Sequence, residues 1–210
     1  MAQSSCYRLE TMEPAMDAHK KSATPGRKSP EGEAPAIALV DPKYPQNVGM
    51  VVRLTSCYGL RQVWFTGERV SLNPMRGERL PREERMKGYK EVQVCHEPDF
   101  FDRFADAVPV AVEVRARSEP LHLFEHPEKA LYVFGPEDGS IPKALLAHCH
   151  RFVVIPTRHC LNLATAVATV LWDREYKNWF GGKIEFPLTP GAFERRGFLK
   201  TPADIVFGAG

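Results

Sequence analysis

Residues 131–142 read Leu-Tyr-Val-Phe-Gly-Pro-Glu-Asp-Gly-Ser-Ile-Pro, an apolar run followed by a loop with two glycines. The run Leu131–Phe134 offers apolar side chains to both faces, which is typical of a strand buried in a parallel sheet. Gly135 leaves room for a flat ligand against the backbone, and Gly139 predicts a left-handed turn into a helix that begins at Pro142. The stretch therefore predicts a buried strand whose carboxyl end opens into a binding loop.

Four similar apolar runs predict four further strands. They cover residues 36–40, 62–66, 110–114 and 152–155. Between and after these runs we expect helices over residues 47–58, 99–107, 142–148 and 161–180. Strands that are apolar on both faces and alternate with helices form a mostly parallel sheet flanked by helices. The predicted fold class is therefore α/β.

Length and composition predict one folded domain with polar ends. The chain has 210 residues, 43% of them hydrophobic, and no run approaches the roughly 18 apolar residues of a membrane helix. Residues 1–34 mix Ser, Pro, Gly, Lys and Glu, which predicts a flexible N-terminal arm. The strand and helix pattern occupies residues 35–180, and residues 181–210 are expected to form a C-terminal extension. We expect a protein without a membrane segment.

Cysteine usage predicts reduced thiols and a cytoplasmic location, because the number of cysteines is odd and their spacing lacks a disulfide framework. The cysteines are Cys6, Cys57, Cys95, Cys149 and Cys160. Pairs of cysteine and histidine in this chain also lack the spacing of common structural zinc sites. We therefore expect no metal.

Two further strand ends carry polar residues. Residues 45–53 read Pro-Gln-Asn-Val-Gly-Met-Val-Val-Arg, in which Asn47 suits a helix N-cap and Arg53 has open space above Gly49. Residues 155–166 read Ile-Pro-Thr-Arg-His-Cys-Leu-Asn-Leu-Ala-Thr-Ala and lead into a helix rich in small residues. Taken singly, these features are also explained by a helix cap, a solvated arginine and close core packing.

The order of the three segments resembles the SpoU/TrmH family of RNA methyltransferases over about residues 36–180. The motifs are Asn-x-Gly-x-x-x-Arg at 47–53, Phe-Gly-Pro-Glu-x-Gly at 134–139, and Ile-Pro followed by Leu-Asn at 155–162. The resemblance implies a SPOUT-type fold with a C-terminal deep trefoil knot, in a homodimer. It also implies methyl transfer from S-adenosylmethionine to a ribose 2′-hydroxyl of tRNA or rRNA. The minimal architecture resembles the smaller tRNA-directed members slightly more than the ribosomal ones.

The resemblance also implies roles for individual residues. Arg53 corresponds to the arginine at the reacting hydroxyl, supplied to the cofactor pocket of the opposite subunit. A guanidinium with a reference pKa above about 12 is a poor base, so we expect Arg53 to position the hydroxyl and stabilise developing negative charge. The other catalytic-site residues are Asn47, Glu137 and Asn162. The cofactor-binding residues are Val112, Glu113, Gly135, Ile155, Cys160 and Leu161.

We expect the RNA partner to bind to a local basic patch, because the formal net charge of the whole chain is only +2. The densest basic stretch follows the second predicted strand and is a candidate for binding RNA phosphates. Its residues include Arg76, Arg79, Arg82, Arg85 and Lys87. A solvated charged loop is the other explanation of this stretch.

One departure from the family pattern leaves a second function open. The family motif has Ser-Leu-Asn where this chain has Cys160-Leu161-Asn162. A thiol fills the volume of a serine hydroxyl but is a weaker hydrogen-bonding partner. The alternative function is a catalytically silent RNA-binding dimer with the same fold. A generic nucleotide-binding α/β enzyme would leave the order of the three motifs unexplained.

Overall fold

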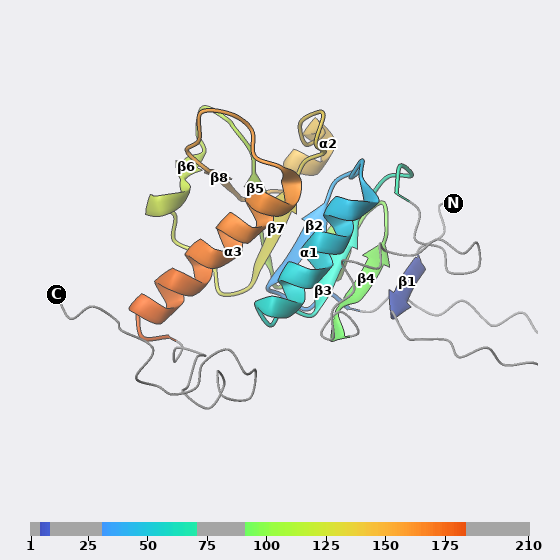
Figure 1. The fold of residues 1–210 in the computed structure, drawn as a ribbon, viewed down its shortest axis with the longest axis horizontal. Coiled ribbons are helices and arrows are strands. Elements are labelled where there is room, and N and C mark those ends of the chain that lie inside the picture. The colour runs from blue at the N-terminus through green and yellow to red at the C-terminus, as the bar shows by residue number, and fades with distance from the viewer. Residues whose placement is uncertain (1–4, 9–30, 71–90, 184–210) are drawn as a thin grey trace, which may run out of the picture. The chain divides into compact units, whose positions relative to one another are not determined.

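The computed structural model of the chain describes residues 5–8, 31–70 and 91–183. Its strands are β1 (Ser5–Arg8), β2 (Ala36–Leu39), β3 (Gln62–Phe65), β4 (Gln93–His96), β5 (Val108–Val112), β6 (Glu119–Pro120), β7 (Ala130–Phe134) and β8 (Arg151–Val154). They form one sheet in the order β1-β4-β3-β2-β7-β5-β8-β6 (Figure 1). From β4 to β6 all neighbours are parallel, and β1 runs antiparallel to β4. The predicted α/β class is confirmed.

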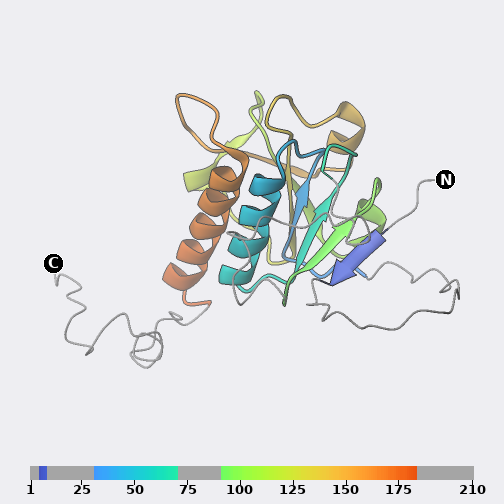
Figure 2. The ribbon, with the colours of Figure 1, turned by 45° about the vertical axis from the view of Figure 1, so that its right-hand side comes forward.

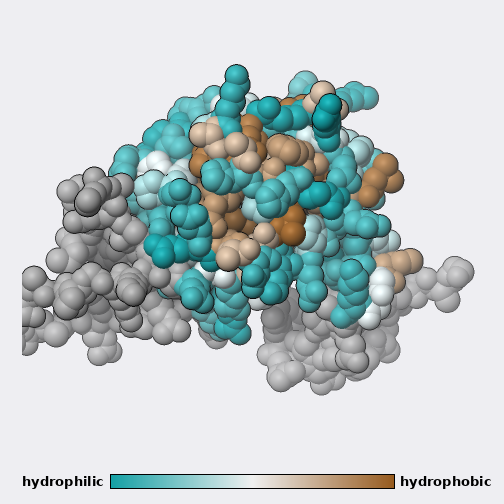
Figure 3. All heavy atoms as spheres, turned by 180° about the vertical axis from the view of Figure 1, so that it is seen from behind, coloured by the Kyte–Doolittle hydropathy of each residue, from teal (hydrophilic) through white to brown (hydrophobic). Residues whose placement is uncertain are grey.

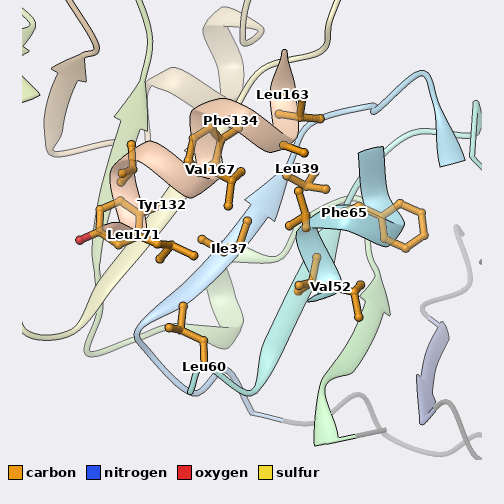
Figure 4. Close-up of a cluster of buried hydrophobic side chains, with 14 of the residues drawn as sticks. Ile37, Leu39, Val52, Leu60, Phe65, Tyr132, Phe134, Leu163, Val167 and Leu171 are labelled. Carbon is orange, nitrogen blue, oxygen red and sulfur yellow. The ribbon is translucent and has the colours of Figure 1, made fainter. Parts of the chain in front are cut away.

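Helices α1 (Pro45–Cys57) and α3 (Leu163–Phe180) lie side by side on one face of the sheet (Figures 1 and 2). Their valines and leucines pack on the strands beneath them, as the close-up shows for Val52, Val167 and Leu171 (Figure 4). These side chains meet Ile37 and Phe134, which are buried in β2 and β7. The strands are therefore buried from this side by the two longest helices that the structure describes.

The opposite face packs on the 3-10 turn η4 (Phe101–Arg103) and the short helix α2 (Lys143–Leu146). The helix predicted over residues 99–107 is wrong, because η4 is all that forms there. Phe104 donates its N–H to the carbonyl of Phe101 at 2.9 Å, which is 3-10 rather than α-helical bonding. The segment that connects β4 to β5 is short, because β5 already begins at Val108. Its phenylalanine rings are buried against the sheet, and this packing determines the shape of the segment.

Strand β1 lies inside the expected N-terminal arm and was not predicted. It pairs antiparallel with β4, and the register sets Cys6 directly opposite Cys95. Cys95 is disulfide-bonded, so the prediction of reduced thiols is wrong for this residue. The described cysteines that are free thiols are Cys57, Cys149 and Cys160.

The remaining predicted elements are present within a few residues, except that the helix predicted over 142–148 is only α2. Strands β4 and β6 were missed. Residues 1–173 form one compact unit and residues 174–210 another, so the predicted division at 34 and 180 stays a prediction. The trefoil knot also stays a prediction.

Among the described residues no helix is both long and apolar enough to cross a membrane. Nor does any group of three or more His, Cys, Asp or Glu side chains gather there to hold a metal ion.

Candidate active site

A pocket opens at the carboxyl edge of the sheet, where the central strands end in one row. The register aligns Leu39 with Phe134 and Phe134 with Val112, so the loops after β2, β7 and β5 start at the same level. Ligands of open α/β sheets bind at this edge. The pocket is lined by the loops after β5, β7 and β8 and by the start of α3. The residues predicted to bind the cofactor all lie in the lining: Val112, Glu113, Gly135, Ile155, Cys160 and Leu161.

Glu113 joins two of the loops that line the pocket. Its carboxylate accepts the N–H of Ile141 at 3.0 Å and the N–H of Val114 at 3.1 Å. The first of these bonds holds the loop after β7 against the end of β5. Glycine at position 135 suits the same close approach, because a Cβ there would make a tight contact of 3.2 Å with the nitrogen of Ile141. Gly139 does not have a positive φ, so the predicted left-handed turn there is wrong.

A chain of hydrogen bonds connects the three polar residues predicted for the catalytic site. Asn47 donates its Nδ2 to Oε1 of Glu137 at 2.6 Å, and Asn162 donates its Nδ2 to Oδ1 of Asn47 at 3.0 Å. Oδ1 of Asn162 accepts the N–H of Ala164 at 2.9 Å and so caps α3. We call Glu137, Asn47 and Asn162 the polar chain. It links the loop after β7, helix α1 and the start of α3.

The structure shows that Asn47 is not the helix N-cap that the sequence predicted. Helix α1 starts at Pro45 with Tyr44 as its N-cap, and no side chain caps this end. Asn47 is instead in the first turn of the helix and only 6% exposed. Its amide is used across the site, because a buried amide needs partners for both its donor and its acceptor. Helix capping therefore does not account for Asn47.

A cluster of charged side chains, which the sequence did not reveal, braces the same loops. The guanidinium of Arg69 pairs with Asp41 at 2.9 Å and with Asp138 at 2.9 Å, and Lys43 pairs with Asp138 at 3.1 Å. The backbone N–H of Lys43 donates to Oε2 of Glu137 at 2.8 Å. We call Asp41, Lys43, Arg69 and Asp138 the ionic cluster. It holds the loops after β2, β3 and β7 together next to Glu137.

The backbone conformation next to the ionic cluster explains why residue 67 is a glycine. Asp41 has a φ of +43° and Gly67 a φ of +79°. A Cβ on Gly67 would lie 2.0 Å from the carboxylate of Asp41. Glycine is therefore needed at position 67 both for its conformation and for the approach of the acidic side chain.

The ionic cluster gives the first testable prediction. Hydrogen bonds from Arg69 and then from Lys43 lower the pKa of Asp138 to about 2. We expect Arg69→Gln to raise this pKa toward the ordinary value of 3.8, as measured by NMR titration of the Asp138 carboxyl. Because the pKa is lowered in the folded state, the cluster stabilises the fold above about pH 4 and loses this contribution as the pH falls toward 2.

The stability of the two proteins should therefore differ at neutral pH and converge in acid. Arg61→Gln is the matched control, since Arg61 forms an exposed ion pair with Glu33 away from this cluster. A pKa of Asp138 that stays near 2 in Arg69→Gln would contradict the assignment of the shift to Arg69.

The predicted catalytic arginine lies away from the pocket lining. Arg53 is exposed on α1, in a stripe with Gln46, Met50 and Cys57 at helical spacing. Within the described part of the chain its side chain makes no hydrogen bond or ion pair. The residues predicted to bind RNA, Arg76, Arg79, Arg82, Arg85 and Lys87, lie outside the described residues.

Comparison with known proteins bears directly on this site. A model of the SpoU rRNA Methylase family matches residues 34–172, which include the pocket lining and the polar chain. The chain belongs to this family. The motifs at residues 47–53, 134–139 and 155–162 all fall within the SpoU match, so the predicted family is confirmed.

Individual relatives of this SpoU protein are distant. The tRNA (cytidine-2′-O-)-methyltransferase TrmJ of Methanocaldococcus jannaschii is 25% identical over 159 residues, 66% of this chain and 66% of TrmJ. The SpoU methyltransferase AviRb of Streptomyces viridochromogenes, solved with AdoMet, has a TM-score of 0.59 and 16% identity, covering 71% of this chain and 60% of AviRb. A structure concerning 2-OH methylation of C/U34 on tRNA has a TM-score of 0.55 and 25% identity, covering 70% of this chain and 96% of that one.

This SpoU chain thus spans just under two thirds of the length of TrmJ and less of AviRb. It covers nearly the whole of the smaller tRNA-related structure. The likenesses support the arrangement of the sheet and its helices.

Proposed function

We propose that this protein is an S-adenosylmethionine-dependent RNA methyltransferase that acts on a ribose 2′-hydroxyl, with tRNA as substrate. The observation that carries the proposal is that the second and third family motifs line one pocket, and that the polar chain joins the first motif to both of them through Asn47. The match to TrmJ, which is named as a tRNA 2′-O-methyltransferase, supports the choice of reaction and RNA.

The lining suits S-adenosylmethionine. Phe134, Ile155 and Leu163 offer apolar surface for an adenine ring, and the carboxylates of Glu113 and Glu137 suit a positively charged sulfonium. The remaining contacts would come from the backbone at Gly135 and from Cys160. When bound, the cofactor supplies an electrophilic methyl group. The other steps of the reaction fall to residues of this chain.

Arg53 is assigned to the ribose hydroxyl. A guanidinium carries hydrogen-bond donors and no acceptor, so Arg53 donates hydrogen bonds that orient the oxygen and stabilise negative charge as the oxygen attacks. The polar chain fixes the start of α3 against the loop after β7, so that the pocket keeps its shape during the reaction. Positioning of this kind accounts for a large part of the rate enhancement in displacement reactions.

Because Arg53 does not line the pocket of its own chain, we propose that it acts in the pocket of a second copy. Mixing two inactive variants tests this directly. Arg53→Ala lacks the arginine, and Gly135→Val is expected to distort the pocket, since the added side chain crowds the backbone of Ile141 in the loop after β7. If the residues act in different subunits, mixed dimers regain one complete site and measurable activity. Activity that stays at the level of the separate variants would contradict the shared site.

Calorimetry with S-adenosylmethionine, followed by methyl transfer to unmodified tRNA and rRNA, tests the proposed reaction. We expect saturable cofactor binding and methylation of tRNA, with mass mapping placing the methyl on a ribose. Cofactor binding without methylation of either RNA would instead support the catalytically silent RNA-binding dimer.

Cys160 provides a further prediction, because it stands where the family motif has serine. Its thiol is free, exposed and part of the pocket lining. If it serves packing and cofactor contact, Cys160→Ser keeps kcat/KM within about threefold, or roughly 0.7 kcal/mol. The measurement is steady-state methyl transfer. A complete loss of activity in Cys160→Ser would reveal a specific role for the thiol.

A further inference from the structure

A second pocket lies next to the first, on the other side of Glu113. It is formed by the turn after β5, the residue Ser140, helix α2 and strand β8, and it has a volume of about 580 Å³. This volume is in the range of pockets that hold small molecules. Glu113 and Val114 line both pockets. A molecule bound in the second pocket would therefore lie close to the cofactor site without occupying it.

The second pocket carries two arginines that have no acidic partner among the residues that the structure describes. Arg115 and Arg117 both line it and are exposed. Their side chains make no ion pair or hydrogen bond with the residues that the structure describes. The acidic residue in the lining, Glu113, already accepts two backbone N–H groups. The pocket is therefore suited to an anion, and guanidinium groups bind phosphate through paired hydrogen bonds.

The turn that carries the arginines is closed by its own hydrogen bonds. Ser118 donates its N–H to the carbonyl of Arg115 at 3.0 Å and its hydroxyl to the carbonyl of Glu113 at 2.7 Å. These bonds fix the backbone on both sides of the arginines before any ligand arrives. Ordering of the ligand site then costs less free energy on binding.

The lining also includes three large apolar side chains. Phe152 of β8 is partly buried, Leu146 of α2 is 7% exposed, and Val114 is 75% exposed. Figure 3 shows apolar surface surrounded by hydrophilic residues on the face of the molecule opposite α1 and α3. An aromatic and aliphatic surface beside two arginines matches a planar base attached to a phosphate, because bases stack on such surfaces while phosphates pair with arginine.

We propose that the second pocket binds a phosphorylated nucleoside unit of the RNA substrate, next to the nucleotide that is methylated. This inference rests on the proposed function for its RNA, and it assigns substrate anchoring to Arg115 and Arg117. The site takes a nucleotide of the bound strand, with its phosphate on the two arginines and its base against Phe152 and Leu146.

The test compares two double variants with the same charge change. Arg115→Ala/Arg117→Ala removes the arginines of the second pocket. Arg61→Ala/Lys129→Ala is the control, since these residues precede β3 and β7 and so lie at the opposite edge of the sheet. Both are measured for binding of unmodified tRNA by fluorescence anisotropy over a range of salt, for S-adenosylmethionine binding, and for methyl transfer.

We expect the pocket variant to weaken tRNA binding and raise KM for tRNA about tenfold or more, with kcat and cofactor affinity within twofold of the wild type. Its salt slope should fall by roughly 1–2, as expected for the loss of one or two phosphate contacts. Equal effects in pocket and control variants, or unchanged tRNA binding in the pocket variant, would overturn the proposal.

The anisotropy measurement separates this inference from the proposed function. If the wild type methylates no RNA but only the pocket variant loses tRNA binding, the reaction is wrong and the pocket assignment stands. If methylation occurs and the pocket variant keeps the wild-type KM, the pocket assignment is wrong. A free mononucleotide would offer the second pocket the same base and phosphate as a nucleotide of the RNA. Competition of tRNA binding with free 5′-AMP and 5′-CMP distinguishes these two ligands. Binding of a free mononucleotide more tightly than tRNA would overturn the assignment to RNA.

Discussion

Arg53→Ala is expected to lower kcat for methyl transfer by about 10²- to 10³-fold, the usual cost of removing one donor that stabilises negative charge in a transition state. The affinity for S-adenosylmethionine should stay within about twofold. The physical reason is the separation of the two parts: Arg53 is exposed on α1 and absent from the pocket lining. The two readouts are single-turnover methyl transfer to tRNA and calorimetric titration with the cofactor.

Two controls sharpen this prediction. Arg61→Ala removes an exposed arginine that pairs with Glu33, and it should leave both readouts unchanged. Arg53→Lys keeps the charge but loses the planar fork of donors, so it should recover only part of the rate. If Arg53→Ala loses cofactor affinity along with turnover, the arginine is needed for the pocket itself and the proposed division of roles is wrong.

Asn47→Asp is expected to break the hydrogen bond to Glu137 in the polar chain at neutral pH. At acidic pH we expect the hydrogen bond, and with it the stability of the protein, to be partly restored. The change replaces the Nδ2 donor, 2.6 Å from Glu137, with a carboxylate oxygen in a site that is 6% exposed. Two carboxylates at this distance cannot both stay ionised, so the pair holds a proton at an elevated pKa. Loss of a buried hydrogen bond costs about 1–3 kcal/mol. Displacement of the pocket loops should lower kcat by about 10²-fold.

The sign of the pH dependence identifies the cause. As the pH falls below the raised pKa, the shared proton restores a hydrogen bond, so the deficit in Tm relative to the wild type should shrink from pH 8 to pH 5. The deficit is expected to be roughly 2–4 °C per kcal/mol for a chain of this size. Asn47→Ala is the matched control, with a deficit that does not change over this range. A pH-independent deficit in Asn47→Asp would show that the contact with Glu137 is not responsible.

The sequence was sufficient for the centre of the fold, and the reason is the burial of its strands. β2 and β7 are apolar along their whole length, and β3 is apolar after its first residue, Gln62, so their side chains alone reveal them. Strand β1 reads Ser-Cys-Tyr-Arg and β6 has two residues, and neither has a pattern to detect. The turn η4 contains helix-like spacing but is shaped by packing on residues such as Ala36 and Trp64, which lie far away in sequence.

The candidate site divides in a similar way. The polar chain could be anticipated because its members lie in motifs with fixed order, although the motifs did not reveal that Asn47 bonds to both other members. Arg69 was missed because it belongs to no motif. It contacts Asp138 only after folding, since the two residues are 69 positions apart in the sequence. The partners of such a side chain depend on how the loops are brought together, and a single sequence does not record this.

The edge of the sheet at β6 restricts how copies of this protein can assemble. Strand β6 has two residues, and Pro120 has no N–H to offer to a neighbouring strand. The ion pair of Glu119 with Arg151 on β8, at 2.7 Å, places charge at the same edge. Extension of the sheet from one molecule into the next is therefore blocked on this side. The second copy that we propose for Arg53 would instead meet the face of α1 on which this arginine stands.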